Sequence, residues 1–360
     1  MGTVFIIGAG ASNEIGMPIG IELRNCIIDI LTAVKDCINI SSANMSHYFD
    51  KPQYIQEARD EIMEYYKYEL KNTDKAYSTI NNIIQSLELT SSIDNLLYDF
   101  RNSPDIQTIG KIAIVTAILK AESESALIKP TSYSNIKPSM EGTWYYSLFL
   151  ELNKQADLTE FIRRLNNIYF IVFNYDRTLE YYLYNSIMRF YKTNNKETSE
   201  IINNINIYHP YGQAGFLEFQ NSKIKNDFGV SKTNNTLLLS SLIKTFMLDN
   251  IINDEEYKKA CKFLYDAEKV FFLGFAFYPQ NIDLLFPNKV TRSERDEHRP
   301  GTTYSKVSNY YGTFYNISEI NKNSIISMMK NKNERIKDFI GCNMKCIDFF
   351  YELSSIISFC

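Results

Sequence analysis

The order of apolar and polar residues predicts an α/β protein. Apolar runs of strand length occur at 3–7 and within the segments 167–190, 204–215 and 267–286, and a polar or glycine-containing turn follows each of them. Helical patterns follow the first, second and last of these turns. Strands that alternate with helices form parallel sheets with helices on both faces. We therefore expect the turns to share the carboxyl edge of one sheet, where open α/β sheets bind ligands.

A long helical stretch interrupts this alternation. Segments 55–71, 76–89 and 109–125 have helical periodicity and no strand pattern, and 129–139 reads as a loop with two prolines and three serines. Residues 287–315 are rich in charge and predict an exposed loop, and the tail from 318 reads mostly as helix. The domains we predict are a Rossmann-like sheet domain of residues 1–44 and 140–315, an inserted helical subdomain of residues 45–139, and C-terminal helices of residues 316–360.

Composition excludes several classes of protein. The formal net charge is −4 and no run of lysine or arginine stands out, so no nucleic-acid footprint is visible. No run of about 18 apolar residues predicts a membrane span. The six cysteines form no CxxC pair, which argues against a zinc ribbon and leaves no metal site to propose. Scattered cysteines, and a first strand that begins almost at Met1, favour a cytoplasmic protein without a targeting peptide.

The sequence GAGASNEIGMPIG at 8–20 follows the first strand. Gly8 and Gly10 fit the dinucleotide fingerprint GxGxxG, but Asn13 takes the third glycine's place and no second strand ending in an acid follows about 20 residues later. No GxxxxGK[ST] occurs either. Backbone amides in such a loop can approach a phosphate closely, so we expect a nucleotide here. The alternative is a tight turn without a ligand.

Three further turns carry candidate chemistry. In FNYDRTLE, Asn174 can hold a water or a carbonyl, and Asp176 can bind a ribose hydroxyl or an amide, or cap the next helix. In IYHPYGQAG, His209 is either a proton acceptor or a structural histidine. Gly274 in FLGFAFYPQN lets a nucleotide lie on the backbone, or is a plain turn. Asp94 begins an amphipathic helix; by itself the position favours a surface cap, and we include it among the candidate nucleotide contacts.

Taken in order, these motifs resemble the sirtuin superfamily. The chain looks most like the bacterial sirtuin-like NAD hydrolases of anti-phage defence, which have a helical insert and no zinc ribbon, and the match covers the sheet-forming parts, about half of the chain. The resemblance implies NAD as the substrate, no metal, and cleavage of the bond between nicotinamide and ribose.

The resemblance also implies roles for residues that match the family's motifs. Asn174 would position the attacking water, Asp176 would contact the nicotinamide side, and His209 would take a proton from water or ribose. The loop would hold the diphosphate and cover the nicotinamide pocket, and a second turn would support the adenosine half. The residues implied for these last two roles are Gly8, Ala9, Gly10, Ala11, Ser12, Gly16 and Pro18, and then Gly274 and Phe275.

The sequence differs from the motifs of the family at several positions, and these differences favour alternatives for the base and for the function. The run IGIELR at 19–24 lacks the phenylalanine–arginine pair of the deacylases, and the paired CxxC motifs are missing. In many relatives the catalytic histidine directly precedes a glycine, whereas here Tyr211 has that place, which makes Tyr211 the second candidate for the base. The alternative functions are an NAD-dependent deacylase or ADP-ribosyltransferase, and a non-catalytic module that binds NAD or ADP-ribose.

A toxic NAD hydrolase must be held inactive in an uninfected cell. We expect control by homo-oligomerisation or by a separate sensor or ATPase partner. Residues 287–315 and the C-terminal helices are the surfaces we expect to make these contacts.

Overall fold

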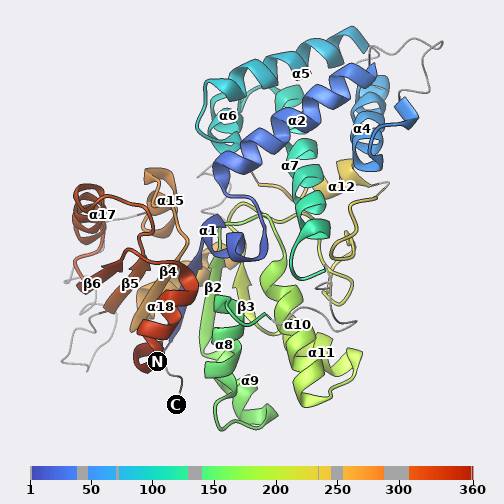
Figure 1. Ribbon diagram of the computed structural model, residues 1–360. Coiled ribbons are helices and arrows are strands. Elements are labelled where there is room, and N and C mark those ends of the chain that lie inside the picture. The colour runs from blue at the N-terminus through green and yellow to red at the C-terminus, as the bar shows by residue number, and fades with distance from the viewer. Residues whose placement is uncertain are drawn as a thin grey trace.

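The chain folds around a six-stranded, all-parallel sheet with the order β3-β2-β1-β4-β5-β6 in a computed structural model (Figure 1). The structure describes residues 2–38, 48–69, 73–128, 140–233, 235–244, 254–287, 308–357 and 359. The strands are β1 (Thr3–Ile7), β2 (Ile168–Val172), β3 (Asn206–Tyr208), β4 (Lys269–Leu273), β5 (Ser308–Thr313) and β6 (Ile336–Cys342).

The central strands are apolar on both sides because helices cover both faces of the sheet. Phe5 lies opposite Phe170 and Phe271 in the register, and these rings stack on one face with Phe350 of α18 (Cys346–Glu352). On the other face, Tyr169 packs on Phe263 of α14 (Glu255–Asp266), with ring centroids 4.7 Å apart. The predicted fold class, a Rossmann-like parallel sheet with helices on both faces, is confirmed.

Further helices lie around the sheet, and those between β1 and β2 include the predicted helical stretch. They are α1 (Ala9–Ser12), the 3₁₀ helix η1 (Asn13–Ile15), α2 (Gly20–Ile38), α4 (Gln53–Glu69), α5 (Thr73–Glu88), α6 (Ile93–Asp99), α7 (Pro104–Glu124), α8 (Trp144–Asn153), α9 (Leu158–Asn166), α10 (Thr178–Tyr191), α11 (Asn195–Asn203), α12 (Thr236–Ser240), α15 (Pro279–Leu285), α17 (Glu319–Lys332) and α19 (Ser354–Ile357).

The helices between β1 and β2 form a block of their own. Helix α7 is its centre, since it contacts α2, α4, α5, α6 and α12 and is apolar nearly all round. Helix α2 also belongs to this block by its contacts with α4, α5 and α7, although the sequence placed it with the sheet. The predicted loop at 129–139 lies outside the described residues, and the domain boundaries stay predictions.

In the C-terminal third, the expected exposed loop was wrong in part, and the mostly helical tail also contains a strand that was not predicted. Residues 308–313 form the mostly buried strand β5 and are not part of an exposed loop. The tail is not only helical, because β6 pairs with β5 at the edge of the sheet. In β6, Lys337 and Asp338 are exposed, so the strand lacks the apolar run that marked the central ones. The charged residues from 292 to 299 lie outside the described residues.

The strand order reverses at β1, and this reversal defines where along the sheet edge we expect a ligand to bind. The chain runs from β1 to β2 and β3 on one side, and returns to β4 on the other side of β1. In open α/β sheets, ligands bind beyond the carboxyl ends of the strands at such a reversal. The helical block lies beyond this edge, with α1 between it and the sheet (Figure 1).

Candidate functional site

The two glycine turns after β1 and β4 pack directly on one another. The amide of Gly8 donates to the Leu273 carbonyl over 2.9 Å, and that of Gly10 donates to the Gly274 carbonyl over 3.0 Å. A Cβ on Gly274, whose φ is +55°, would lie 2.0 Å from the nitrogen of Ala11, and one on Gly8 would lie 2.6 Å from the Gly274 carbonyl oxygen. These glycines are therefore required for close contact between two backbones, whatever else the turn binds.

This packing limits how many backbone amides of the first turn can bind an anion. Besides the amides of Gly8 and Gly10, that of Ala11 is also committed, since it donates to the Gly8 carbonyl over 2.9 Å. Ala9 and Gly10 are half-buried, whereas Gly16 is exposed and ends η1 with a φ of +88°. Pro18 lies in the following connection to α2. A diphosphate contact by the turn thus stays a prediction.

Asn174 follows β2 and presents an acceptor without a partner. Its Nδ2 donates to Ser12 Oγ over 2.9 Å and to the Gly8 carbonyl over 3.2 Å. A main-chain carbonyl only accepts, so these bonds fix which end of the amide is nitrogen. Asn174 Oδ1 is buried and has no hydrogen-bond partner among the residues that the structure describes. Buried polar atoms are nearly always paired, so this oxygen is suited to accept a bond from water or from a ligand hydroxyl.

Asp176 lies next to Asn174 in a cluster of hydroxyl groups. Its Oδ1 accepts from the hydroxyl and the amide of Thr178 and from Ser12 Oγ, the last over 3.3 Å. Thr178 is the first residue of α10, so Asp176 satisfies one free amide at the start of this helix, although Arg177 has the capping position and caps with no side-chain bond. Tyr145 completes the cluster with its hydroxyl 2.8 Å from Thr178 Oγ1. Burial raises the pKa of Asp176, and the bonds from Thr178 and Ser12 oppose that rise.

His209 is held at both ring nitrogens. Nδ1 lies 3.0 Å from the carbonyl oxygen of Asn174, and Nε2 lies 2.9 Å from Oε1 of Glu180 in α10. Burial alone would lower the pKa of His209, but Glu180 and the Asn174 carbonyl more than offset this, and the pKa is raised. A ring that donates at both nitrogens is an imidazolium and cannot accept a proton. This arrangement favours a positioning role, and the predicted base role finds no support in it.

The hydroxyl of Tyr211, the second candidate for the base, also has a hydrogen-bond partner inside the protein. The Tyr211 hydroxyl donates to Asn281 Oδ1 over 2.5 Å, and burial raises the pKa of this phenol far above its ordinary value. Phe275, expected beneath the adenosine, is 3% exposed and packs edge-on against Phe173, with ring centroids 5.0 Å apart. Both side chains thus belong to an aromatic cluster between the ends of β2 and β4.

Asp94 connects the helical block to the turn after β2. The prediction that Asp94 is a surface cap was therefore wrong. Ser92 caps α6, because its Oγ accepts from the amide of Asn95 over 3.2 Å. Asp94 instead accepts a hydrogen bond from the hydroxyl of Tyr175, the residue between Asn174 and Asp176. Burial raises the pKa of Asp94, and the bond from Tyr175 opposes this.

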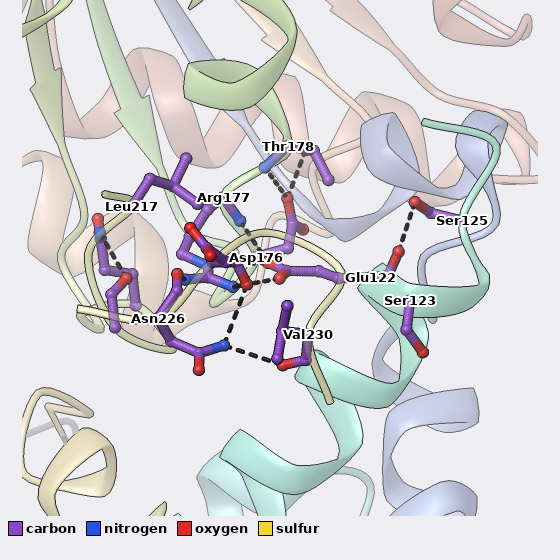
Figure 2. A network of polar contacts seen from close by, with 12 residues as sticks. Glu122, Ser123, Ser125, Asp176, Arg177, Thr178, Leu217, Asn226 and Val230 are labelled. Carbon is purple, nitrogen blue, oxygen red and sulfur yellow. Dashed lines mark hydrogen bonds and ion pairs between the residues drawn. The ribbon is translucent and has the colours of Figure 1, made fainter. Parts of the chain in front are cut away.

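A second contact from the block is a buried ion pair (Figure 2). Arg177 follows Asp176 and pairs with Glu122 of α7, and both side chains have no exposed area. Burial raises the pKa of Glu122, against the opposing effect of Arg177. This pair was not predicted from the sequence, and neither were Tyr145, Thr178 and Glu180. The spacing of Asp176, Thr178 and Glu180 at the start of a helix was a signal for the last two.

The sheet also explains an apparent gap in the dinucleotide pattern. No strand ending in an acid follows the first turn at the expected distance, because Asp29, which has that spacing, lies within α2. The helical block, however, separates β1 from its neighbour β2, and the turn after β2 contains Asp176. An acid therefore lies in the turn after the strand next to β1, four residues beyond the end of β2 and far from the glycines in sequence because of the insertion.

Carboxylates outnumber cations around Asn174. Glu122 pairs with Arg177 and Glu180 with His209, whereas Asp176 forms no ion pair with any residue that the structure describes. Asp94, bonded to Tyr175 beside Asn174, likewise forms no ion pair with a described residue, so two negative charges are uncompensated when all these groups are ionised. The described residues hold no cluster of three or more His, Cys, Asp or Glu side chains that could bind a metal ion.

No protein-family model matches the chain, and searches of curated proteins and of solved structures gave no significant match. Within the described ranges, no helix is long and apolar enough to span a membrane.

Proposed function

We propose that the protein hydrolyses NAD to nicotinamide and ADP-ribose. The observation that carries the proposal is the unpartnered Oδ1 of Asn174, fixed in place at the reversal of strand order and linked through Ser12 to the unpaired carboxylate of Asp176. The resemblance to sirtuin-like NAD hydrolases adds the identity of the nucleotide.

The reaction needs acceptor groups around a developing cation. The bond between C1′ of the ribose and the pyridinium nitrogen breaks, its electron pair neutralises nicotinamide, and positive charge builds on the ribose. Water then bonds to C1′ and loses a proton, so that NAD⁺ and water give nicotinamide, ADP-ribose and H⁺. A carboxylate in a buried site stabilises such a cation far more strongly than it would in water.

Different residues of the chain have different roles in this reaction. Asn174 Oδ1 accepts a hydrogen bond from the attacking water or from a ribose hydroxyl, and its Nδ2 is held by Ser12 and Gly8 so that Oδ1 cannot rotate away. Asp176 supplies negative charge opposite the cation. His209 donates to the Asn174 carbonyl and keeps the turn in place. The water that attacks an oxocarbenium-like ribose needs little help from a strong base.

The test is incubation of the purified chain with NAD and no acceptor, with nicotinamide and ADP-ribose followed by chromatography. Asn174→Ala should lower turnover at least about 100-fold, the size of effect that misplacing a reacting group has. The matched control is Asn204→Ala, which removes an exposed asparagine after α11 whose amide bonds only its own helix. Absence of NAD cleavage by the unmodified protein would refute the proposal, whether or not the protein binds NAD.

A second candidate function is a module that binds NAD or ADP-ribose without cleaving it. The observation that favours it is that His209 and Tyr211, the two candidates for a base, are both engaged inside the protein. In this case Asp176 would accept the ribose hydroxyls, as the acid after the second strand does in dinucleotide-binding sheets. Binding by titration calorimetry without release of nicotinamide would distinguish it.

We further propose that NAD cleavage serves as an anti-phage effector activity, controlled by an oligomer or a separate partner. Expression of the unmodified chain should then lower cellular NAD and arrest growth when the activating signal is present. Asn174→Ala should do neither at equal protein level. Growth arrest by both variants alike would separate toxicity from NAD cleavage and contradict this role.

A further inference from the structure

Glu122 is the residue of the helical block that is most closely tied to the turn after β2. It lies near the end of α7, a helix otherwise apolar along most of its length, and its side chain is completely buried. It is joined to Arg177, which is equally buried and directly follows Asp176. The two residues are 55 positions apart in sequence.

The contact includes the main chain as well as the side chains. Glu122 Oε1 accepts from Arg177 Nε and from the Arg177 backbone amide, each over 3.1 Å, and Oε2 accepts from Nη2. The backbone amide belongs to the peptide group that joins Asp176 to Arg177. Glu122 therefore fixes the orientation of the peptide unit that directly follows the Asp176 side chain.

The pair also fixes neighbouring segments. Arg177 Nη1 donates to the Asn226 carbonyl over 2.6 Å, and Asn226 in turn donates from its amide to the Phe216 carbonyl over 2.9 Å (Figure 2). Just after α7, the amide of Ala126 donates to the Ile15 carbonyl at the end of the first turn, over 2.9 Å. One end of one helix thus holds both turns that form the site.

Stability alone does not account for such a pair. A buried ion pair is often no more stabilising than apolar side chains of the same volume, because both charges lose their water. Apolar side chains could fill the space, but they could not accept the hydrogen bond from the Arg177 main chain.

We propose that Glu122 is a positioning residue, which acts through Arg177 to hold the Asn174–Asp176 turn in the geometry that cleaves NAD, so that the helical block is part of the catalytic unit. This inference rests on the proposed function. It predicts that loss of the pair affects the chemical step more than substrate binding, because the turn moves while the remaining contacts to NAD stay in place.

The test compares two double variants. Glu122→Met/Arg177→Met removes both charges together and leaves neither one buried alone. The matched control is Glu160→Met/Arg164→Met in α9, where Arg164 also pairs with a glutamate and donates to two main-chain carbonyls, those of Leu152 and Lys154. The first variant should lower kcat about 100-fold with KM within about threefold, and the control should leave both unchanged.

A conservative variant checks that the main-chain bond is responsible. Glu122→Gln keeps an oxygen that can accept from the Arg177 amide, so its kcat should lie closer to that of the unmodified protein than the kcat of the double variant does. A double variant that folds, as judged by circular dichroism, and keeps kcat within about twofold would overturn the inference.

Hydrogen exchange provides a readout that does not need activity. Removal of the pair should speed exchange of the peptide 173–179 at least about tenfold, while a peptide of β5 (308–313) exchanges as before. If the unmodified protein cleaves no NAD, the proposed function fails, and this measurement still decides the positioning role. Unchanged exchange at 173–179 would refute it.

Discussion

His209 Nδ1 lies 3.0 Å from the main-chain carbonyl oxygen of Asn174, so the imidazole that the sequence offered as a base donates to the residue that presents the free acceptor. Glu180 holds the other ring nitrogen. His209 is thus held between the main chain of Asn174 and the carboxylate of Glu180, with a hydrogen-bond partner at each ring nitrogen.

The charge on His209 should make stability depend on pH. The pKa of His209 is raised in the folded protein, despite burial, chiefly by Glu180. A group whose pKa rises on folding stabilises the protein fully below its unfolded pKa of about 6.5, and this contribution is lost as the pH rises through the folded pKa. Urea unfolding from about pH 6 to about pH 9 should show this fall in the free energy of unfolding.

His209→Gln should remove that part of the pH dependence, because glutamine does not titrate. The comparison isolates His209 from the other titrating groups, which are the same in both proteins. Identical pH profiles of stability for the two proteins would show that folding does not shift the pKa of His209.

Asp176→Asn tests the uncompensated charge of this carboxylate. Asparagine keeps an oxygen for the Thr178 amide but removes the negative charge, so kcat for NAD should fall about 100-fold while the fold persists. The control is Asp157→Asn, since Asp157 caps α9 through the amide of Glu160 over 2.8 Å, away from the site. If Asp176 serves only as a cap, the two variants will behave alike in a nicotinamide-release assay.

Gly274→Ala tests the packing of the two glycine turns. A Cβ there meets Ala11 N at 2.0 Å at a φ of +55°, so we expect a loss of more than about 3 kcal/mol in the free energy of unfolding by urea. Gly20→Ala is the control, because no atom lies within 4 Å of its Cβ position at the start of α2, and it should be neutral or stabilising by up to about 1 kcal/mol. Tolerance of Gly274→Ala would mean that the turns are not packed backbone to backbone.

Glu14→Ala tests a carboxylate shared by two helix starts. Glu14 accepts from the Trp144 amide in α8 over 3.0 Å and from the Ile347 amide in α18 over 2.9 Å. Leaving both amides without a partner should cost about 2 kcal/mol or more of unfolding free energy in urea. Glu22→Ala, which removes an exposed carboxylate bonded to the Ile19 amide, should cost less than about 1 kcal/mol. Equal losses would contradict the shared role of Glu14.

Local pattern was sufficient for much of the fold. The runs at 3–7, 168–172 and 269–273 are strands because a strand covered on both faces is apolar along nearly its whole length, and this is visible in any short window of sequence. The same applies to the helices of the block. It does not apply to β6, an edge strand with exposed Lys337 and Asp338, whose identity depends on its partner β5.

The sequence by itself determined the strands of the sheet centre, the helical block and the turns in which Asn174, Asp176, His209 and Gly274 lie. Only the tertiary structure decided what these side chains meet: that His209 is engaged at both nitrogens, that Gly274 packs on Gly10, and that Arg177 is neutralised by Glu122. Local conformation depends on residues a few positions away. Hydrogen bonds and buried charges depend instead on which distant segments the folded chain brings together. No periodicity in the long segment between β1 and β2 encodes that choice.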